Sequence, residues 1–195
     1  LDGRIGRKFL HAGPGYGGSC FPKDTLALVK TGADVERPLR IVETVVDINT
    51  KRKSRMADKI IETCGGVDGK TIAILGVTFK PNTDDMRDSP SLDIVASLQA
   101  AGATIRAYDP EGMEEAGSIL SGVEWCNDAY DAMEGAEAVC IITEWNQFRA
   151  LNFERMKTLL RAPIVIDLRN IYKPDDMLAA GFKYVSIGRV RSEGP

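Results

Sequence analysis

The sequence predicts an α/β protein in which a helical dimerisation segment is followed by a Rossmann-like, doubly wound parallel sheet. From Lys70 onward, short apolar runs alternate with amphipathic segments, and strict β-α alternation is typical of a parallel sheet. Before Lys70 the pattern differs, because a glycine-rich stretch at residues 1–23 leads into two helical segments. We therefore expect two parts, residues 1–66 and residues 67–195.

The first part contains two predicted helices. Asp24 can cap a short helix that ends at Gly32. Pro38 opens a longer helix with apolar residues near a 3.6-residue period, which ends at Gly65-Gly66. This helix has more apolar positions than a lone exposed helix needs, so we expect it to pack against its symmetry mate in a two-fold homodimer. The alternative is that it packs only on its own chain.

The second part contains six predicted strands, several of them continuous apolar runs of the kind found in strands buried on both faces. They cover residues 71–77, 104–108, 123–126, 138–143, 164–168 and 184–187. Predicted helices lie between them at residues 91–101, 111–120, 129–134, 153–160 and 174–180. Ligands of such sheets bind beyond the carboxyl ends of the strands, which here are residues 76–80, 109–110, 143–145 and 167–169.

Composition excludes several classes of function. The net charge of −3 argues against bulk nucleic-acid binding, although the first 60 residues are basic and could serve a phosphorylated ligand or form a solvated helix face. No apolar stretch is long enough for a membrane span, and the first residues lack an apolar signal core. The chain begins without Met, which is expected of a piece of a longer protein. The irregular cysteines and the single histidine predict no metal site and a cytoplasmic, reducing location.

The cysteines differ in their sequence context. Cys20 lies between the glycine-rich stretch and a helix start, close to Lys23, where a thiol should ionise more easily than a free one. A lowered pKa suits a nucleophile, but a buried structural thiol is an equal alternative. Cys64, Cys126 and Cys140 lie at a helix end, at a strand end and in an apolar strand, and we expect them to be structural.

Two glycine patterns bear on nucleotide binding. Gly13, Gly15 and Gly18 match G-x-G-x-x-G, but no apolar strand precedes them and no helix follows directly, so we reject a dinucleotide fingerprint. After the first predicted strand, Gly76 stands where the fingerprint would be. We therefore expect that this domain does not hold a dinucleotide in the usual way.

Three cations follow predicted strand ends. They are Lys80, Arg87 and Arg169. Fixed cations beyond a carboxyl end suit a phosphate. The alternative is that they pair with neighbouring aspartates on the surface.

Several of these segments together resemble the nucleotide-sugar dehydrogenases of the UDP-glucose/GDP-mannose dehydrogenase family. Gly15–Asp24 resembles the catalytic-cysteine segment of that family. Residues 3–10, residues 76–80 with Arg87 seven residues on, and residues 165–169 are similar as well. Ser19-Cys20-Phe21-Pro22 favours the branch that acts on UDP-glucose over the branches that act on N-acetylated sugars. GDP-mannose dehydrogenases are the nearer alternative, and a non-catalytic nucleotide-binding or dimerisation module is the other.

The resemblance implies a reaction and a domain plan. Members have an N-terminal NAD-binding domain, a central helical domain that forms the homodimer, and a C-terminal Rossmann-like domain that binds the nucleotide of the sugar donor. This chain resembles the end of the second and all of the third, which implies a fragment that is inactive alone. The reaction is NAD-dependent, four-electron oxidation of UDP-glucose to UDP-glucuronate, in which Cys20 forms a thiohemiacetal and then a thioester. Asp24 is similar to the residue that positions or activates water.

The resemblance also implies binding residues. Cys20, Lys23 and Arg87 resemble residues that meet the cofactor NAD. Nine residues resemble those that hold UDP-glucose in the family: Arg4, His11, Gly13, Gly15, Tyr16, Gly17, Phe79, Lys80 and Arg169. The resemblance implies that Arg4 reaches a neighbouring subunit.

Overall fold

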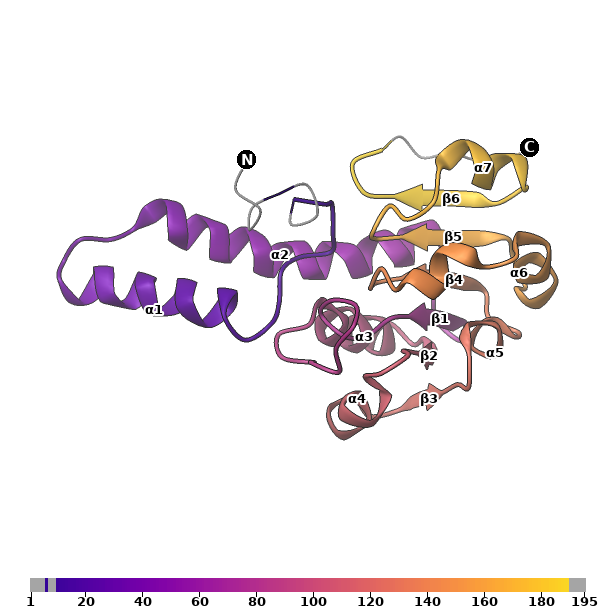
Figure 1. Cartoon of the computed structure of the whole chain (residues 1–195), viewed down its shortest axis with the longest axis horizontal. Helices are drawn as coiled ribbons and strands as arrows, with labels where there is room; N and C mark the ends of the chain where they lie inside the picture. The colour runs from indigo at the N-terminus through magenta and orange to yellow at the C-terminus, as the bar shows by residue number, and fades with distance from the viewer. Residues whose placement is uncertain (1–5, 7–9, 190–195) are drawn as a thin grey trace.

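The computed structural model describes residue 6 and residues 10–189. A helical hairpin projects to one side of a sheet that carries helices on both faces (Figure 1). The hairpin consists of α1 (Phe21–Asp34) and α2 (Arg40–Thr63). None of the helices in these described ranges combines the length and the apolar character needed to cross a bilayer.

All six strands of the sheet are parallel, in the order β3-β2-β1-β4-β5-β6. The strands are β1 (Thr71–Leu75), β2 (Thr104–Tyr108), β3 (Val123–Trp125), β4 (Ala138–Ile141), β5 (Ile164–Asp167) and β6 (Lys183–Ser186). The order reverses direction between β1 and β4, which makes their carboxyl ends the switch point at which doubly wound sheets bind ligands. The predicted doubly wound parallel sheet is confirmed.

The helices of the sheet domain are short. They are α3 (Pro90–Ala100), α4 (Met113–Ile119), α5 (Ala129–Met133), α6 (Phe153–Leu159) and α7 (Pro174–Ala179), and a 3₁₀ helix, η2 (Asn146–Ala150), precedes α6. The sequence did not predict η2. Predicted strands are up to two residues too long at their carboxyl ends, because the chain turns out of the sheet early; at Gly76, for example, φ is +83°.

Alternate residues of the central strands β1, β4 and β5 enter two different cores. Ile72 and Ile74 of β1 pack with α2, α3 and α4 on one face, whereas Ala73 and Leu75 pack with α5, α6 and α7 on the other. Ile60, near the end of α2, is fully buried in the first core. The last turns of α2 therefore pack with the sheet, and the predicted division at residues 66 and 67 remains a prediction.

The hairpin begins and turns differently from the prediction. Helix α1 starts at Phe21 with Cys20 as its N-cap residue, so Asp24 lies in the first turn and the predicted cap at Asp24 is wrong. Gly32 does not end the helix, which runs on to Asp34. It is buried, and a Cβ there would lie 2.8 Å from the carbonyl oxygen of Arg37, so a glycine is needed where the returning chain crosses the helix.

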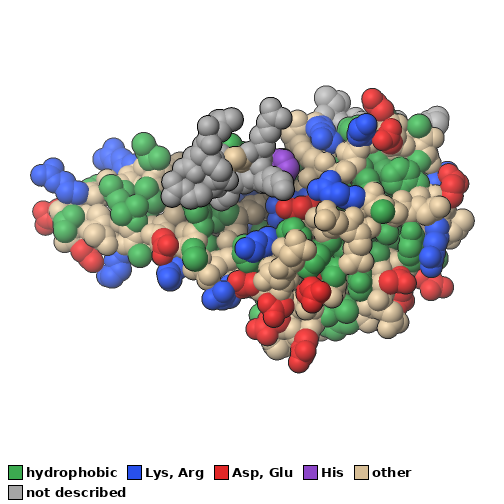
Figure 2. Space-filling model, in the orientation of Figure 1, with side chains coloured by type: hydrophobic (Ala, Val, Ile, Leu, Met, Phe, Trp, Pro, Cys, Tyr) green, Lys and Arg blue, Asp and Glu red, His purple; other side chains and the backbone are tan. Residues whose placement is uncertain are grey.

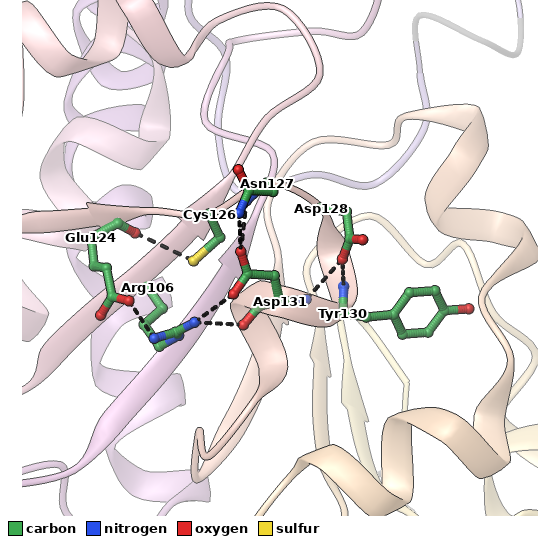
Figure 3. Close-up of polar contacts among 7 residues, drawn as sticks. All are labelled: Arg106, Glu124, Cys126, Asn127, Asp128, Tyr130 and Asp131. Carbon is green, nitrogen blue, oxygen red and sulfur yellow. Dashed lines mark hydrogen bonds and ion pairs between the residues drawn. The ribbon is translucent and has the colours of Figure 1, made fainter.

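A polar cluster fixes the edge of the sheet (Figure 3). Arg106 of β2 forms ion pairs with Glu124 of β3 and, at 2.8 Å, with Asp131 of α5. Asp131 also accepts hydrogen bonds from the backbone and side-chain N–H groups of Asn127. The Asn127 backbone N–H, together with Arg106, lowers the pKa of Asp131. Strand β3 and helix α5 are thus held to the sheet by charge-assisted bonds.

Candidate functional site

Residues 76–79 follow the carboxyl end of β1, and each of their backbone N–H groups donates a hydrogen bond. Gly76 N donates to Tyr108 O at 2.9 Å. Val77 N and Thr78 N both donate to the Asp109 carboxylate, at 2.7 and 3.1 Å. Phe79 N completes the series by donating to the backbone oxygen of Asp85 at 3.2 Å.

The carbonyl groups of the same segment are bonded as well. Hydroxyl groups of Ser89 and Ser91 donate to Val77 O, and that of Thr143 donates to Thr78 O. A segment held at its N–H and C=O groups has a defined conformation despite lying outside the sheet. The side chains at its end are the half-buried Phe79 and the exposed Lys80.

Phe79 and Lys80 lie together at this strand end. The Lys80 ammonium group is 5.1 Å from the centroid of the Phe79 ring. The hydroxyl of Thr78 donates to Lys80 O at 3.1 Å, which fixes the backbone that carries the lysine. The pair therefore presents an aromatic face and a cation side by side at the carboxyl end of β1.

Arg169, after β5, reaches across the switch point toward Phe79. Its Nε donates to Ile142 O at 2.8 Å and lies 2.9 Å from a carboxylate oxygen of Glu144, while Nη2 donates to Phe79 O at 3.1 Å. Burial lowers the pKa of Arg169, and the nearby Glu144 opposes that shift. The guanidinium group therefore fixes the backbone at Phe79.

Residues 11–18, which we call the glycine loop, pack on Arg169 and on α2. A Cβ on Gly13 would lie 2.6 Å from Nη1 of Arg169, and Arg52 Nε donates to Gly13 O at 2.8 Å. Asn49 holds Tyr16 through two bonds: Tyr16 N donates to Oδ1 at 2.8 Å, and Nδ2 donates to Tyr16 O at 3.1 Å. The loop is thus ordered by side chains of α2.

The far end of the loop packs on the segment after β1. Gly18 N donates to Arg87 O at 2.8 Å, and a Cβ on Gly18, where φ is +88°, would lie 2.8 Å from the Phe79 ring. A Cβ on Gly17 would collide with the backbone oxygen of Asp88. These close approaches explain why the loop contains so many glycines.

A pocket of about 360 Å³ lies between the loop and α2. Its lining residues are His11, Ala12, Gly13, Gly15, Tyr16, Val45, Ile48, Asn49 and Arg52. The predicted site residues His11, Gly13, Gly15 and Tyr16 therefore share one pocket. Arg4 lies outside the described residues.

Cys20 differs from the other three cysteines. It is exposed at the start of α1, whereas Cys64, Cys126 and Cys140 are buried, as the sequence predicts for structural thiols. Burial raises the pKa of Cys64 to about 11 and raises that of the other two as well. Cys20 is therefore the accessible thiol of the chain.

The charged groups near Cys20 are paired with each other. Lys23 Nζ lies 3.7 Å from Asp24, and both side chains are exposed. Arg87 forms a two-point pair with Asp85, Nε to Oδ1 at 2.9 Å and Nη2 to Oδ2 at 2.8 Å. The structure thus shows the alternative in which Arg87 pairs with a neighbouring aspartate. The Arg87 side chain is nevertheless 68% exposed.

The switch point itself does not fit a dinucleotide. A Cβ on Gly76 would lie 2.6 Å from the Thr143 side chain, so the first turn packs closely against the segment that follows β4. Beside it, the carboxylate of Asp109 bonds the backbone N–H groups that a fingerprint would offer to a pyrophosphate. The predicted absence of a usual dinucleotide site thus has a physical basis in Thr143 and Asp109.

Family models match both parts of the chain. Residues 73–174 match the UDP binding domain of the UDP-glucose/GDP-mannose dehydrogenase family, and residues 1–51 match its central domain. This chain belongs to that family. The predicted resemblance is confirmed.

Named relatives within the family are UDP-glucose 6-dehydrogenases. The chain is 58% identical over 190 residues to the UDP-glucose 6-dehydrogenase of Rhizobium meliloti (strain 1021), a match that covers 97% of the chain and 44% of that relative. It is 46% identical to UDP-glucose 6-dehydrogenase TuaD of Bacillus subtilis (strain 168), covering all of the chain and 42% of the relative. The chain thus spans less than half the length of these family members.

Solved structures give the same fold. A UDP-glucose dehydrogenase from the archaeon Pyrobaculum islandicum has a TM-score of 0.79 at 34% identity, and the match covers 96% of this chain and 41% of that one. A GDP-mannose dehydrogenase from Pseudomonas aeruginosa has a TM-score of 0.71 at 19% identity, covering 86% and 39%, and at that identity shows the fold alone.

Sequence reasoning missed three residues that hold the candidate site together. Asn49 and Arg52 bond the glycine loop, and Asp109 bonds residues 77 and 78. The spacing of Asn49 and Arg52, one turn apart on a predicted helix, was the available signal, because such residues share a face. For Asp109 the signal was a carboxylate directly after an apolar strand.

Proposed function

We propose that residues 76–80 of this chain bind the UDP part of a UDP-sugar. Lys80 contacts phosphate oxygens and Phe79 contacts the nucleotide, because an exposed cation and an aromatic face lie together on a fixed backbone at the switch point. That fixed pair is the observation that carries the proposal. Arg169 contributes by holding Phe79 and by supporting the glycine loop.

The sugar part lies toward the glycine loop and Cys20 in this proposal. Gly17 and Gly18 pack directly on the segment that carries Phe79, so the loop joins the nucleotide site to the exposed thiol. Its pocket, with His11 and Tyr16, faces α2. The substrate is UDP-glucose, in line with the names of two relatives that match nearly the whole of this chain.

The proposed reaction is oxidation of the primary alcohol of the sugar to a carboxylate. NAD supplies the acceptor for the two hydrides that this four-electron change releases. Cys20, Lys23 and Arg87 would contact it, since all three are exposed beside the loop. The switch point of this domain does not hold it.

Cys20 has the central chemical role. Its sulfur adds to the aldehyde carbon made by the first oxidation, and the carbonyl oxygen takes a proton, giving a thiohemiacetal. This addition is needed because an aldehyde does not readily release a second hydride until a nucleophile has added. After the second oxidation the carbon is a thioester of Cys20. Water, positioned by Asp24, attacks that carbon, and the thiol leaves as the carboxylate forms.

We also propose a homodimer through the hairpin. Ile41, Val45 and Ile48 of α2 are 82%, 39% and 57% exposed, and Leu26 and Leu28 of α1 add to this surface. Hydrophobic side chains are prominent over the hairpin in Figure 2. An exposed apolar face of this kind is typical of an interface between subunits.

The cytoplasm is the proposed location. All four cysteines are free thiols, which supports a reducing compartment.

Calorimetric titration with UDP tests the nucleotide site. We expect Lys80→Ala to weaken binding about tenfold or more, since one charge-assisted contact contributes roughly 1.5–3 kcal/mol. Lys173→Ala, at an exposed lysine before α7, is the control and should bind UDP like the unmodified chain. Tighter binding of GDP than of UDP would favour the GDP-mannose alternative. An unchanged affinity in Lys80→Ala would remove that residue from the site.

A further inference from the structure

Asp109 is a fully buried carboxylate at the carboxyl end of β2. One of its oxygens, Oδ2, accepts hydrogen bonds from Val77 N at 2.7 Å, from Thr78 N and the Thr78 hydroxyl at 3.1 Å, and from Trp145 Nε1 at 3.2 Å. The other, Oδ1, accepts from the backbone N–H groups of residues 111 and 112, at 3.1 and 2.9 Å. The carboxylate therefore joins three segments that follow different strands.

These donors explain how the charge is tolerated. A buried carboxylate is costly unless hydrogen bonds stabilise it, and here the described donors are N–H and O–H groups of uncharged side chains or backbone. Conversely, Val77 N and Thr78 N lie where the chain has already left β1 and no helix has begun. Without Asp109 these two buried N–H groups would lose their acceptor.

The same bonds lead directly to the proposed nucleotide contacts. The Thr78 hydroxyl oxygen lies 3.1 Å from both Asp109 Oδ2 and Lys80 O, so its single proton is shared between the two acceptors. Phe79 lies between the residues so fixed. A change at Asp109 therefore alters the backbone that carries Phe79 and Lys80, although Asp109 itself is buried beneath them.

We propose that Asp109 is the positioning residue of the UDP site: it fixes Val77 and Thr78, and through them sets the place of Phe79 and Lys80. This inference rests on the proposed UDP binding. It predicts that the buried carboxylate of Asp109 controls the affinity for the nucleotide through residues 76–80, without contacting the nucleotide itself. The rival view is that Asp109 stabilises the fold and has no particular effect on binding.

The test combines Asp109→Asn with UDP titration and amide hydrogen exchange on the 195-residue chain. The amide keeps the size but retains one acceptor oxygen, so either residues 77 and 78 or residues 111 and 112 lose their partner. We expect UDP binding to weaken about tenfold or more, and the amides of residues 77–79 to exchange faster. Trp145→Phe removes a single donor to Asp109 and should weaken binding about two- to threefold.

Met177→Ala is the matched control. Met177 is fully buried in the core formed with α5, α6 and α7, which also contains Trp145, but none of the described hydrogen bonds to Asp109 involves it. Its truncation therefore destabilises the chain while leaving the donors to Asp109 in place. At a temperature where all variants are folded, as judged by circular dichroism, it should bind UDP with unchanged affinity. If Asp109→Asn does not fold, Trp145→Phe carries the test.

A double-mutant cycle separates positioning from stability. If Asp109 acts through Lys80, then Lys80→Ala should weaken binding about threefold or less in the Asp109→Asn background, compared with tenfold or more alone. Full additivity, or an affinity for UDP in Asp109→Asn equal to that of Met177→Ala, would overturn the inference. If the unmodified chain does not bind UDP, the proposed function is contradicted instead. In that case, unchanged amide exchange of residues 77–79 in Asp109→Asn would by itself reject the positioning role.

Discussion

The hairpin and the sheet domain use their apolar residues in opposite ways. In the sheet domain the strand residues are buried in two cores, whereas α1 buries only Gly32 among its described residues. Helix α2 belongs to both regions. Ile41 near its start is 82% exposed, and Ile60 near its end is fully buried.

This difference shows what each region requires for stability. The sheet domain obtains its core from its own residues and from the last turns of α2. The hairpin presents an apolar surface that the described residues leave exposed, so we expect its stability and role to depend on another surface. Four experiments test this contrast, from the largest expected effect to the smallest.

Thiol reactivity should differ most strongly between the two regions. Cys20 of the hairpin is exposed, whereas Cys64, Cys126 and Cys140 are buried with raised pKa values. At pH 8 a thiol with a pKa of about 11, as for Cys64, is ionised in only about one molecule in a thousand, so iodoacetamide should alkylate Cys20 about 100-fold faster than Cys64. Cys126 and Cys140, which are buried with raised pKa values, should also react more slowly than Cys20. Peptide mass spectrometry over time measures this. Comparable labelling rates for all four cysteines would contradict the distinction between one accessible thiol and three buried ones.

Truncating isoleucines along α2 should separate its two halves. Ile60→Ala removes a fully buried side chain and should lower the free energy of unfolding by about 2–5 kcal/mol. Ile41→Ala, at concentrations low enough to keep the chain monomeric, should change it by no more than about 0.5 kcal/mol. Denaturant unfolding provides both values. Equal losses would mean that the hairpin also has a core within the chain.

A charge on the hairpin surface should change the oligomeric state. We expect the unmodified chain to sediment as a dimer at about 10 μM and Ile48→Arg to sediment as a monomer, because an arginine cannot be buried unpaired in an apolar interface. Ile119→Arg is the control on α4, where the isoleucine is 52% exposed compared with 57% for Ile48. A dimer lost in both variants, or in neither, would argue against the hairpin interface.

Acid should affect the edge of the sheet more than the hairpin. The pKa of Asp131 is lowered by its bonds to Asn127 and Arg106, so its stabilisation is present above the unfolded value and is lost as the pH falls through the folded one. Asp131→Asn should lower Tm by about 1–4 °C at pH 7, and the difference should shrink below about pH 4. The exposed Lys30–Asp34 pair of α1 gives the comparison, since Asp34→Asn should leave Tm nearly unchanged at both pH values. A difference in Tm that does not shrink at all between pH 4 and pH 2 would exclude the carboxylate as the cause.

The sheet could be predicted because its signals are local. Apolar runs of buried strands, each bounded by turn residues, fixed the number and the order of strands in the chain. The start of α1 was harder, because Cys20-Phe21-Pro22 gives no capping side chain, and the nearby Asp24 resembled a cap while lying in the first turn. Local rules cannot decide between two adjacent starts of this kind.

The site was predictable in part for a similar reason. Phe79, Lys80 and Arg169 follow the ends of parallel strands, and such ends meet at one edge of a sheet. Asn49 and Asp109 were missed because their partners are backbone groups 31 to 33 residues away in the sequence. No periodicity reports a bond between a side chain and a distant peptide group.

Helix α2 also has a mechanical consequence. Its 24 residues form one continuous rod of about 36 Å, anchored at one end on α3 and the sheet core and bonded near its middle to the glycine loop through Asn49. Gly65-Gly66 therefore does not act as a hinge between the glycine loop and the sheet, because α2 contacts both of them directly. The Cys20 thiol and residues 76–80 should therefore move as one rigid body. Any opening that admits the substrate must have its hinge elsewhere.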